Sequence, residues 1–223
     1  MTWCLVGSEM CIRDRILAAG FGKRLGHLTQ NTPKPLIQVK GKALIDYHLE
    51  KLIKSGFETV VINLHYLGEQ IEEHITSNFS GKIKIIFSHE KEILGTCGGI
   101  SNVINHFGND DFLVLNADIF SDIDYVYFKK FKAPTIFAVK NDKNGDFSIE
   151  NEKVIVHGEK NFTWTGFSII NSSFFQGMET KYSHYWEDLM MHLAAEGKVV
   201  ADIPNINWYD VGIKDTLDFL NSE

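Results

Sequence analysis

Residues 16–25 read ILAAGFGKRL and place a short apolar run, two glycines and two adjacent cations in ten positions. The first four of these residues predict a short buried strand. Gly20 and Gly22 can adopt positive φ angles, which lets several backbone N–H groups converge on one anion. Lys23 and Arg24 add positive charge, and the Arg24 guanidinium can hold a phosphate through two hydrogen bonds. The stretch predicts a phosphate-binding loop after a strand, although a solvated surface turn has the same local pattern.

A second cation follows in the sequence TPKPL, where Lys34 stands between two prolines. Each proline fixes its own φ angle, so this lysine is carried on a stiff segment. The loop lacks the spacing of a Walker motif and of the GxGxxG dinucleotide motif. The combination of strand, glycine loop and rigid lysine nevertheless favours phosphate binding over a simple turn.

The remainder of the chain alternates short apolar runs with amphipathic stretches, which is typical of parallel strands joined by helices. We expect helices at 43–56, 67–77, 96–107, 186–198 and 214–223, and strands at 59–64, 82–88, 111–118, 133–140 and 199–203. Three further apolar segments, at 147–151, 153–159 and 163–170, follow a turn and predict a smaller antiparallel lobe. The expected fold is α/β, a Rossmann-like open and mostly parallel sheet with helices on both faces. In such sheets ligands bind beyond the carboxyl ends of the strands.

Composition limits the possible partners. The 223 residues include 22 Lys and Arg against 29 Asp and Glu, a formal net charge of −7. This charge argues against a nucleic-acid or membrane-surface binder, and no apolar run approaches the length of a membrane span. We expect a cytoplasmic protein, and nothing in the sequence indicates a protein partner. The three cysteines, Cys4, Cys11 and Cys97, lack CxxC spacing and are expected to be free thiols.

The first 15 residues, MTWCLVGSEMCIRDR, have no helical or strand periodicity and place Arg13, Asp14 and Arg15 directly before the apolar run. A strand at the centre of a parallel sheet is usually apolar throughout. We therefore expect residues 1–15 to be foreign to the protein and to hang free, and a single domain to occupy residues 16–223. On this hypothesis the native strand began a few residues earlier, with a sequence such as Lys-Ala-Met.

Two aspartates are candidate metal ligands. Asp118 follows the apolar strand FLVLNA, which places its carboxylate at the edge of the sheet where the glycine loop also lies. Asp210, in NWYDVG, is the natural second ligand, and Gly212 leaves room for close approach. Mg²⁺ commonly uses one or two protein carboxylates together with substrate phosphates. An aspartate after a strand is also a frequent turn former.

The segment LAAGFGKRLGHLTQNTPKPL resembles the signature of the sugar-phosphate nucleotidyltransferases, LAAGxGxRxxPLTxxxPKPL. It departs from this pattern at His27, where the family has proline, and this change should alter the rigidity of the loop. The resemblance continues through INLHYLGEQIEEHI, ILGTCGGI, FLVLNADIF and WYDVGIKDTLDFL, so it covers nearly all of the chain after residue 15. NLHYLGEQIEEHI and the short length are most similar to the branch that transfers uridylyl groups to N-acetylmuramate α-1-phosphate in bacterial cell-wall recycling.

The resemblance implies a role for each matched position. Its implied catalytic residues are Arg24, Lys34 and Asp118, and its implied Mg²⁺ ligands are Asp118 and Asp210. The implied nucleotide-binding residues are Leu17, Ala18, Ala19, Gly20, Gly22, Lys23, Arg24, Lys34, Gly95 and Asn116. The implied sugar contacts are Asp146 and Gly166. An equal alternative for Gly95 is that it only precedes a helix capped by Thr96, and Trp164 and Trp208 are expected in the core.

These assignments predict that a sugar 1-phosphate attacks the α-phosphorus of a nucleoside triphosphate, with pyrophosphate as the leaving group. UTP and N-acetylmuramate α-1-phosphate are the expected substrates. Glucose, mannose or choline phosphate, with GTP, dTTP or CTP, are alternatives that the residues leave open. A non-catalytic nucleotide sensor is an alternative of a different class, although a sensor has no need for both metal carboxylates.

Overall fold

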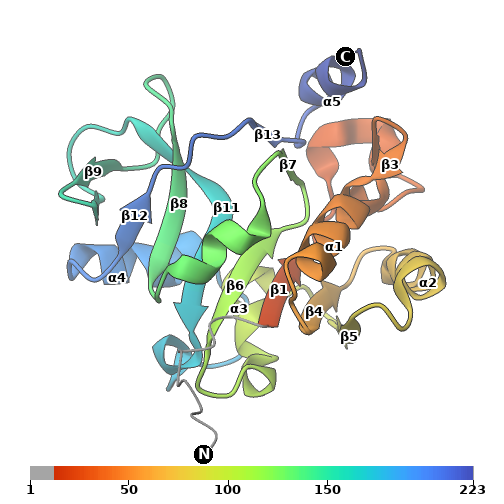
Figure 1. Ribbon diagram of the computed structural model, residues 1–223, viewed down its shortest axis with the longest axis horizontal. Coiled ribbons are helices and arrows are strands. Elements are labelled where there is room, and N and C mark those ends of the chain that lie inside the picture. The colour runs from red at the N-terminus through yellow and green to blue at the C-terminus, as the bar shows by residue number, and fades with distance from the viewer. Residues whose placement is uncertain (1–12, 223) are drawn as a thin grey trace, which may run out of the picture.

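A nine-stranded mixed sheet forms the centre of the protein in the computed structural model, which describes residues 13–222 (Figure 1). In spatial order its strands are β5 (Lys84–His89), β4 (Thr59–Leu64), β1 (Arg13–Leu17), β6 (Asp111–Asn116), β11 (Phe162–Asn171), β8 (Thr135–Lys140), β12 (Val200–Asp202), β10 (Lys153–Ile155) and β9 (Ser148–Glu150). The first four are mutually parallel, and β11 runs antiparallel to both of its neighbours. The expected α/β class with a mostly parallel sheet is confirmed.

Helices and short antiparallel pairs surround this sheet. The α-helices are α1 (Leu44–Lys54), α2 (Gly68–Phe79), α3 (Gly95–Ser101), α4 (Met191–Ala195) and α5 (Lys214–Ser222). The shorter turns are η1 (Lys23–Thr29), η2 (Lys34–Leu36), η3 (Ile104–His106), η4 (Tyr125–Lys130), η5 (Ser172–Phe175) and the π-helical η6 (Trp186–Met190). The small pairs are β2 (Gln38–Val39) with β3 (Lys42–Ala43), and β7 (Ile119–Ser121) with β13 (Trp208–Asp210). None of the helices within residues 13–222 combines the length and apolar character needed to cross a membrane.

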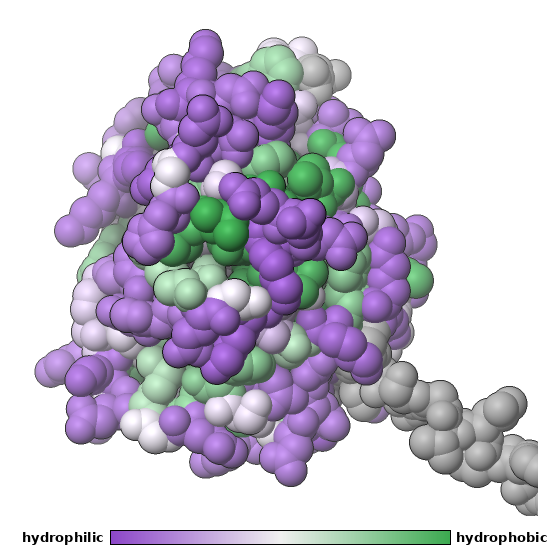
Figure 2. Space-filling model, turned by 90° about the vertical axis from the view of Figure 1, so that its left-hand side faces the viewer, coloured by the Kyte–Doolittle hydropathy of each residue, from purple (hydrophilic) through white to green (hydrophobic). Residues whose placement is uncertain are grey.

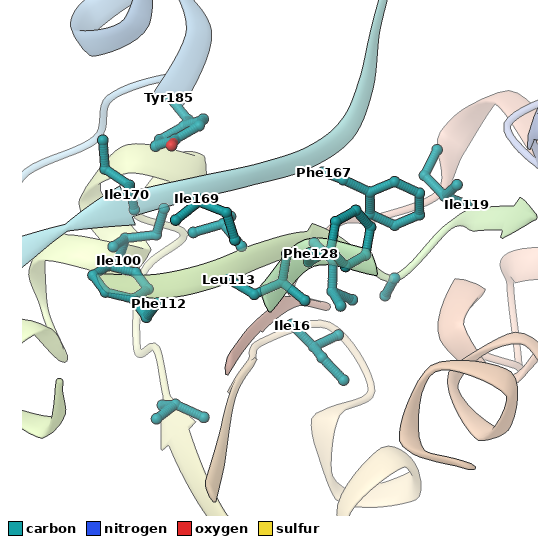
Figure 3. Close-up of a cluster of buried hydrophobic side chains, with 14 of the residues drawn as sticks. Ile16, Ile100, Phe112, Leu113, Ile119, Phe128, Phe167, Ile169, Ile170 and Tyr185 are labelled. Atoms are coloured by element: carbon teal, nitrogen blue, oxygen red, sulfur yellow. The ribbon is translucent and has the colours of Figure 1, made fainter. Parts of the chain in front are cut away.

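The core lies on both faces of the central strands. Phe112, Leu113, Val114 and Leu115 of β6 are all fully buried, as expected for a strand covered on both sides. Figure 3 shows Leu113 among side chains from neighbouring strands and from η4. The face of the molecule drawn in Figure 2 is mainly hydrophilic, and hydrophobic side chains are visible there in recesses between polar ones.

Three elements differ from the sequence-based expectation. The segment predicted as a strand of the small lobe, 163–170, belongs to β11, which lies in the main sheet between β6 and β8. Its apolar side chains suit a central strand as well as a strand of a small lobe. Only the hydrogen-bonded pairing with β6 and β8 shows which of the two it is. The helix expected at 96–107 ends at Ser101, and the separate short turn η3 follows, because the backbone of Val103 is not helical, with a φ of −119°. The helix expected at 186–198 begins as the π-turn η6 and ends at Ala195.

Strand β1 begins before the apolar run, so residues 13–15 do not hang free. Asp14 is fully buried opposite Val60 and Leu113, and Arg15 is also fully buried. The guanidinium Nη2 of Arg15 donates to the Gly99 carbonyl at 2.7 Å, whereas neither carboxylate oxygen of Asp14 has a hydrogen-bond partner among the described residues. Burial raises the pKa of Asp14 well above its usual value.

The hypothesis of a foreign segment stays a prediction. Residues 1–12, which include Cys4 and Cys11, lie outside the described residues. Cys97 is buried and free, and burial raises the pKa of its thiol to about 11.

Candidate active site

The glycine-rich loop leaves the carboxyl end of β1 and folds back against the segment that carries Lys34. Gly22 has a φ of 64°, and a β-carbon there would lie 2.9 Å from Thr29 Cγ2 and 3.2 Å from Lys34 Cβ. Thr29 closes the loop by donating from Oγ1 to the Gly22 carbonyl at 3.0 Å. Glycine is thus required at position 22 for two reasons, its backbone conformation and the closeness of its neighbours. His27, which replaces the family's proline, is exposed on this loop.

Lys34 is held inside the protein, and only 8% of its surface is exposed. Its ammonium group forms an ion pair with Asp118, and its Nζ lies 3.9 Å from Asp210 Oδ1. Pro33 and Pro35 on either side are buried as well. Since a buried lysine needs compensating negative charge, the two carboxylates keep this cation in place.

Asp118 and Asp210 meet because two short strands pair across the end of the sheet. Asp210 in β13 is opposite Ile119 in β7, and the Val211 N–H donates to the Asp118 carbonyl at 2.9 Å. Arg24 joins them from the glycine loop, with Nη2 3.5 Å from Asp210 Oδ2. The structure therefore brings Arg24, Lys34, Asp118 and Asp210 together from four separate segments.

The electrostatics of this cluster are balanced. Burial raises the pKa of Asp210, and the neighbouring Asp118 raises it further, while Lys34 and Arg24 lower it. A β-carbon at Gly212 would lie 2.6 Å from Arg24 Nη2 and 2.8 Å from Asp210 Oδ1. The glycine predicted to leave room for approach is therefore required for the contact between Arg24 and Asp210.

Two carboxylates at one point suit a magnesium ion. Asp210 Oδ1 is buried and accepts no hydrogen bond among the described residues, so a ligand atom remains for a cation. Within residues 13–222 no group of three or more His, Cys, Asp or Glu side chains could enclose a metal by itself. Mg²⁺ is typically bound by one or two carboxylates, with waters and substrate phosphates completing the shell. The residues therefore fit Mg²⁺ better than a metal that needs a protein cage.

Lys23 lies apart from this cluster. Its Nζ lies 5.2 Å from the centroid of the exposed Phe21 ring. Both residues line a cavity of about 400 Å³ together with Tyr66, whose hydroxyl donates to the Gln30 carbonyl at 2.9 Å. Of the two adjacent cations in the motif, only Arg24 reaches the aspartates.

A second cavity, of about 200 Å³, opens beside the end of β1. Its lining includes Leu17, Ala19, Gly20, Asn63, Ile93, Gly95, Thr96, Tyr182 and His184. Three predicted nucleotide-binding positions of the β1 loop and Gly95 thus share one cavity. Ala18 is buried and contributes its backbone N–H, which donates to Asn63 Oδ1 at 2.8 Å. Asn116 is not among the lining residues and lies beside Gly166, where a β-carbon would be 3.0 Å from Asn116 Nδ2.

The sequence analysis did not identify the two side chains that connect these segments. Asn63 Nδ2 donates to Glu90 Oε1 at 2.7 Å, and Glu90 Oε2 accepts from the Leu94 N–H at 3.0 Å. This pair joins the β1 loop, the end of β4 and the loop before α3. Asn63 stands near the carboxyl end of a buried parallel strand, so the rule that ligands bind at that edge could have found it.

The third cavity is a cleft of about 650 Å³ next to the aspartates. Its lining includes Arg24, Asn141, Asn144, Asp146, Thr163, Trp208, Tyr209, Asp210, Ile213 and Thr216. Asp146, a predicted sugar contact, therefore shares a cleft with two members of the cluster. Gly166, the other predicted contact, has a φ of 82° at the irregularity in β11 and is not among the lining residues. Trp208 packs against the core and also faces this cleft, while its indole N–H donates to the Thr165 carbonyl at 2.8 Å.

A buried histidine, His48, lies near Asp118. His48 Nδ1 and the Tyr125 hydroxyl are 2.5 Å apart, and both side chains are buried. Burial and, to a smaller extent, the nearby Lys51 lower the pKa of His48 to about 3. His48 is therefore neutral at physiological pH.

Comparison with known proteins identifies the family. A family model described as nucleotidyl transferase matches residues 15–135. N-acetylmuramate alpha-1-phosphate uridylyltransferase of Neisseria meningitidis serogroup B is 32% identical over 215 residues, which cover 90% of this chain and 93% of that protein. Mannose-1-phosphate guanylyltransferase catalytic subunit beta of Drosophila melanogaster is 28% identical, over 90% of this chain and 59% of that protein.

A solved structure supports the fold. The putative glucose-1-phosphate thymidylyltransferase of Bacillus anthracis has a TM-score of 0.82 at 18% sequence identity, and 94% of each chain is covered. At this identity the likeness concerns the fold alone. Taken with the family model and the relative from Neisseria, it leads to one assignment: the chain belongs to the nucleotidyl transferase family of enzymes.

Proposed function

We propose that the protein transfers a uridylyl group from UTP to N-acetylmuramate α-1-phosphate. The observation that carries this proposal is the convergence of Arg24, Lys34, Asp118 and Asp210 at one end of a cleft that also contains Asp146. The choice of substrates is supported by the relative from Neisseria, whose name states this activity and which the chain matches over most of its length.

The reaction needs no protein nucleophile. A phosphate oxygen of the sugar 1-phosphate forms a bond to the α-phosphorus of UTP, and the bond from that phosphorus to the pyrophosphate oxygen breaks. The task of the protein is to align the two phosphates and to neutralise the charge that builds up on their oxygens. Within the cluster, Lys34 has the rigid mount suited to the α-phosphate, and the more exposed Arg24 is suited to the departing pyrophosphate.

Asp118 and Asp210 are the residues that would hold Mg²⁺. When bound, Mg²⁺ supplies positive charge that polarises the phosphate oxygens and orients them. The two cations and the two carboxylates of the cluster compensate one another, so a further local positive charge is needed before two anionic substrates can meet there. In the proposed reaction UTP is a general cytoplasmic nucleotide and N-acetylmuramate α-1-phosphate belongs to cell-wall recycling, so the protein would act in the cytoplasm.

A pyrophosphate-release assay tests the activity and the substrates together. UTP, CTP, GTP and dTTP are each combined with N-acetylmuramate, glucose and mannose 1-phosphates and with choline phosphate, in the presence of Mg²⁺. We expect the highest kcat/KM with UTP and N-acetylmuramate α-1-phosphate. A preference for another pair would overturn this choice of substrates, and binding of nucleotide without any turnover would indicate a sensor.

Two substitutions test the residue roles. Asp118→Asn should abolish turnover while the circular dichroism spectrum shows that the fold is intact. Lys34→Ala should lower kcat about 100-fold, since one preorganised charge is worth about 3 kcal/mol in the transition state. If Asp118→Asn keeps the wild-type rate, or if Lys34→Ala changes only KM, the assigned roles are wrong.

A further inference from the structure

A short segment of chain, residues 181–185, is hydrogen-bonded to the start of α3 and to the residue before it. The Ser183 N–H donates to the Leu94 carbonyl at 3.0 Å, and the Ser183 carbonyl accepts from the Cys97 N–H at 3.0 Å. The Tyr185 N–H donates to Thr96 Oγ1 at 2.7 Å. We call residues 181–185 the strap. Because hydrogen bonds hold it at three points, its backbone has a defined position beside α3.

The glycines of GTCGG make room for the strap. A β-carbon at Gly95 would lie 2.4 Å from the Ser183 carbonyl oxygen, and one at Gly98 would lie 2.1 Å from the Lys181 carbonyl oxygen. Both distances are shorter than any real contact, and the obstructing atoms belong to the backbone. These two glycines are therefore required by a tertiary contact as well as by any role at the ligand site.

The strap directs two rings into the cavity beside β1. Ser183 is 8% exposed and faces α3, while Tyr182 and His184 on either side of it both line the cavity of about 200 Å³. Side chains two positions apart lie on the same side of an extended segment. The two rings meet edge to face with centroids 5.0 Å apart, and the Tyr182 hydroxyl lies 3.1 Å from His184 Nε2.

The size and lining of this cavity suit a single flat ring. Sites that enclose a whole small ligand usually measure roughly 300–1,000 Å³, so this cavity can take only part of a nucleotide. Leu17 and Ile93 supply apolar surface, and Gly20 connects the cavity to the glycine loop. Tyr182 is 58% exposed, which leaves much of its surface available to a ligand.

We infer that Tyr182 and His184 form an aromatic cover over the nucleobase of the bound triphosphate. This inference rests on the proposed function, because it assigns the base of the same substrate to the cavity next to the phosphate loop. Stacking of an aromatic side chain on a base is tolerant of base identity. The cover therefore contributes affinity for the nucleoside, and polar groups elsewhere in the site set the preference among bases.

Binding measurements without the sugar substrate test the cover directly. Isothermal titration calorimetry of UTP compares the wild type with Tyr182→Ala, Tyr182→Phe and His184→Ala. Tyr182→Ala should weaken UTP binding about 5- to 150-fold, which corresponds to about 1–3 kcal/mol for the loss of one stacking contact. Tyr182→Phe keeps the ring and should bind within about threefold of the wild type. Phe219→Ala removes another exposed aromatic side chain, on α5 and outside the cavity, and should leave UTP binding unchanged.

Inorganic tripolyphosphate serves as a probe without a base. Its affinity should be the same in the wild type and in Tyr182→Ala, because the strap does not reach the phosphates in this assignment. Unchanged UTP affinity in Tyr182→Ala, or equal weakening of UTP and tripolyphosphate, would overturn the cover. Unchanged UTP affinity with a raised KM for the sugar 1-phosphate would overturn it too and would assign the strap to the other substrate.

These measurements distinguish failure of the aromatic cover from failure of the proposed function. If the wild type binds UTP but turns over no substrate pair, the proposed function fails while the effect of Tyr182→Ala on UTP binding still decides the cover. If the panel shows turnover and Tyr182→Ala binds UTP normally, the cover alone fails. Absence of binding of all four triphosphates by the wild type would overturn both.

Discussion

Replacing Asp14 with valine should make the protein more stable at neutral pH. Asp14 lies in β1 opposite Val60 and Leu113, is 0% exposed, and has no hydrogen-bond partner for either carboxylate oxygen among the described residues. Valine has nearly the same size, and its branched side chain suits a buried strand. The substitution therefore removes a buried carboxyl that the adjacent Arg15 compensates only in part, and it creates no cavity.

The expected gain follows from two contributions. Burial of a carboxylate costs several kcal/mol, which the adjacent Arg15 offsets only in part, and burial of a valine side chain contributes about 1.5–3 kcal/mol. The adjacent Arg15 loses the attraction of Asp14, although Glu90 still compensates its charge. We expect a net stabilisation of about 3 kcal/mol or more at pH 7. For a chain of this size that corresponds to an increase in Tm of about 6–12 °C.

The stabilisation by Asp14→Val should depend on pH. Because burial raises the folded-state pKa of Asp14 above its unfolded value, the folded protein binds the proton more tightly. The stability associated with the protonated carboxyl is fully present below about pH 4 and is lost as pH rises toward the folded-state pKa. The difference between Asp14→Val and the wild type should therefore grow with pH, by at most about 1.4 kcal/mol per unit.

Urea unfolding followed by circular dichroism at pH 4, 5, 6, 7 and 8 measures this difference. Other groups titrate equally in both proteins and cancel when the two free energies of unfolding are subtracted. Asp14→Asn is the matched control, since it removes the charge but keeps a buried polar group, and it should recover part of the gain. A difference that is the same at pH 4 and pH 8, or a less stable Asp14→Val protein, would refute the reasoning.

Three further predictions concern buried groups around the site. Gly98→Ala should weaken UTP binding at least 10-fold in calorimetry, because its β-carbon would lie 2.1 Å from the Lys181 carbonyl oxygen and must displace the strap; wild-type affinity would contradict this account. Glu90→Ala should lower the free energy of urea unfolding by about 3 kcal/mol, since it leaves the Leu94 N–H and the Asn63 amide without an acceptor; a loss below about 0.5 kcal/mol would show that these groups find other partners. His48→Gln should reduce the loss of stability as pH falls from about 6.5 to 4. In the wild type the unfolded state takes up a proton in this range, whereas the buried imidazole, with a pKa of about 3, does not. Urea unfolding at pH 7 and pH 5 checks this, and an equal fall in the free energy of unfolding in both proteins would exclude His48 as the source.

Much of the site could be predicted because its chemistry is local in the sequence. Gly22, Arg24 and Lys34 lie close together in the chain, and their conformational and charge properties do not depend on distant residues. Asp118 could be placed because the strand before it is continuously apolar and the carboxyl ends of parallel strands meet at one edge. The motif does not fix the direction of the Lys23 side chain, and the structure places its Nζ over the Phe21 ring.

Other parts of the site depend on contacts that no local pattern specifies. Asn63 and Glu90 look like ordinary polar residues at strand ends, and they become a connection only when β4 and the loop before α3 lie beside β1. Gly95 does begin a helix, as one reading of the sequence expected, but no local pattern shows that the strap from a distant part of the chain approaches Gly95 and Gly98 closely.

The sequence by itself determined the type of most elements and the glycine-rich, cationic character of the loop after β1, because periodicity, glycine conformation and side-chain charge act over a few residues. The tertiary structure alone decided the position of β11 in the main sheet, the meeting of Asp118 with Asp210, and the two rings over the cavity. The physical reason is that each of these depends on which strand edges and loops become neighbours. The arrangement of neighbours is the one that minimises the free energy of the whole packed chain, and no short segment of sequence specifies it.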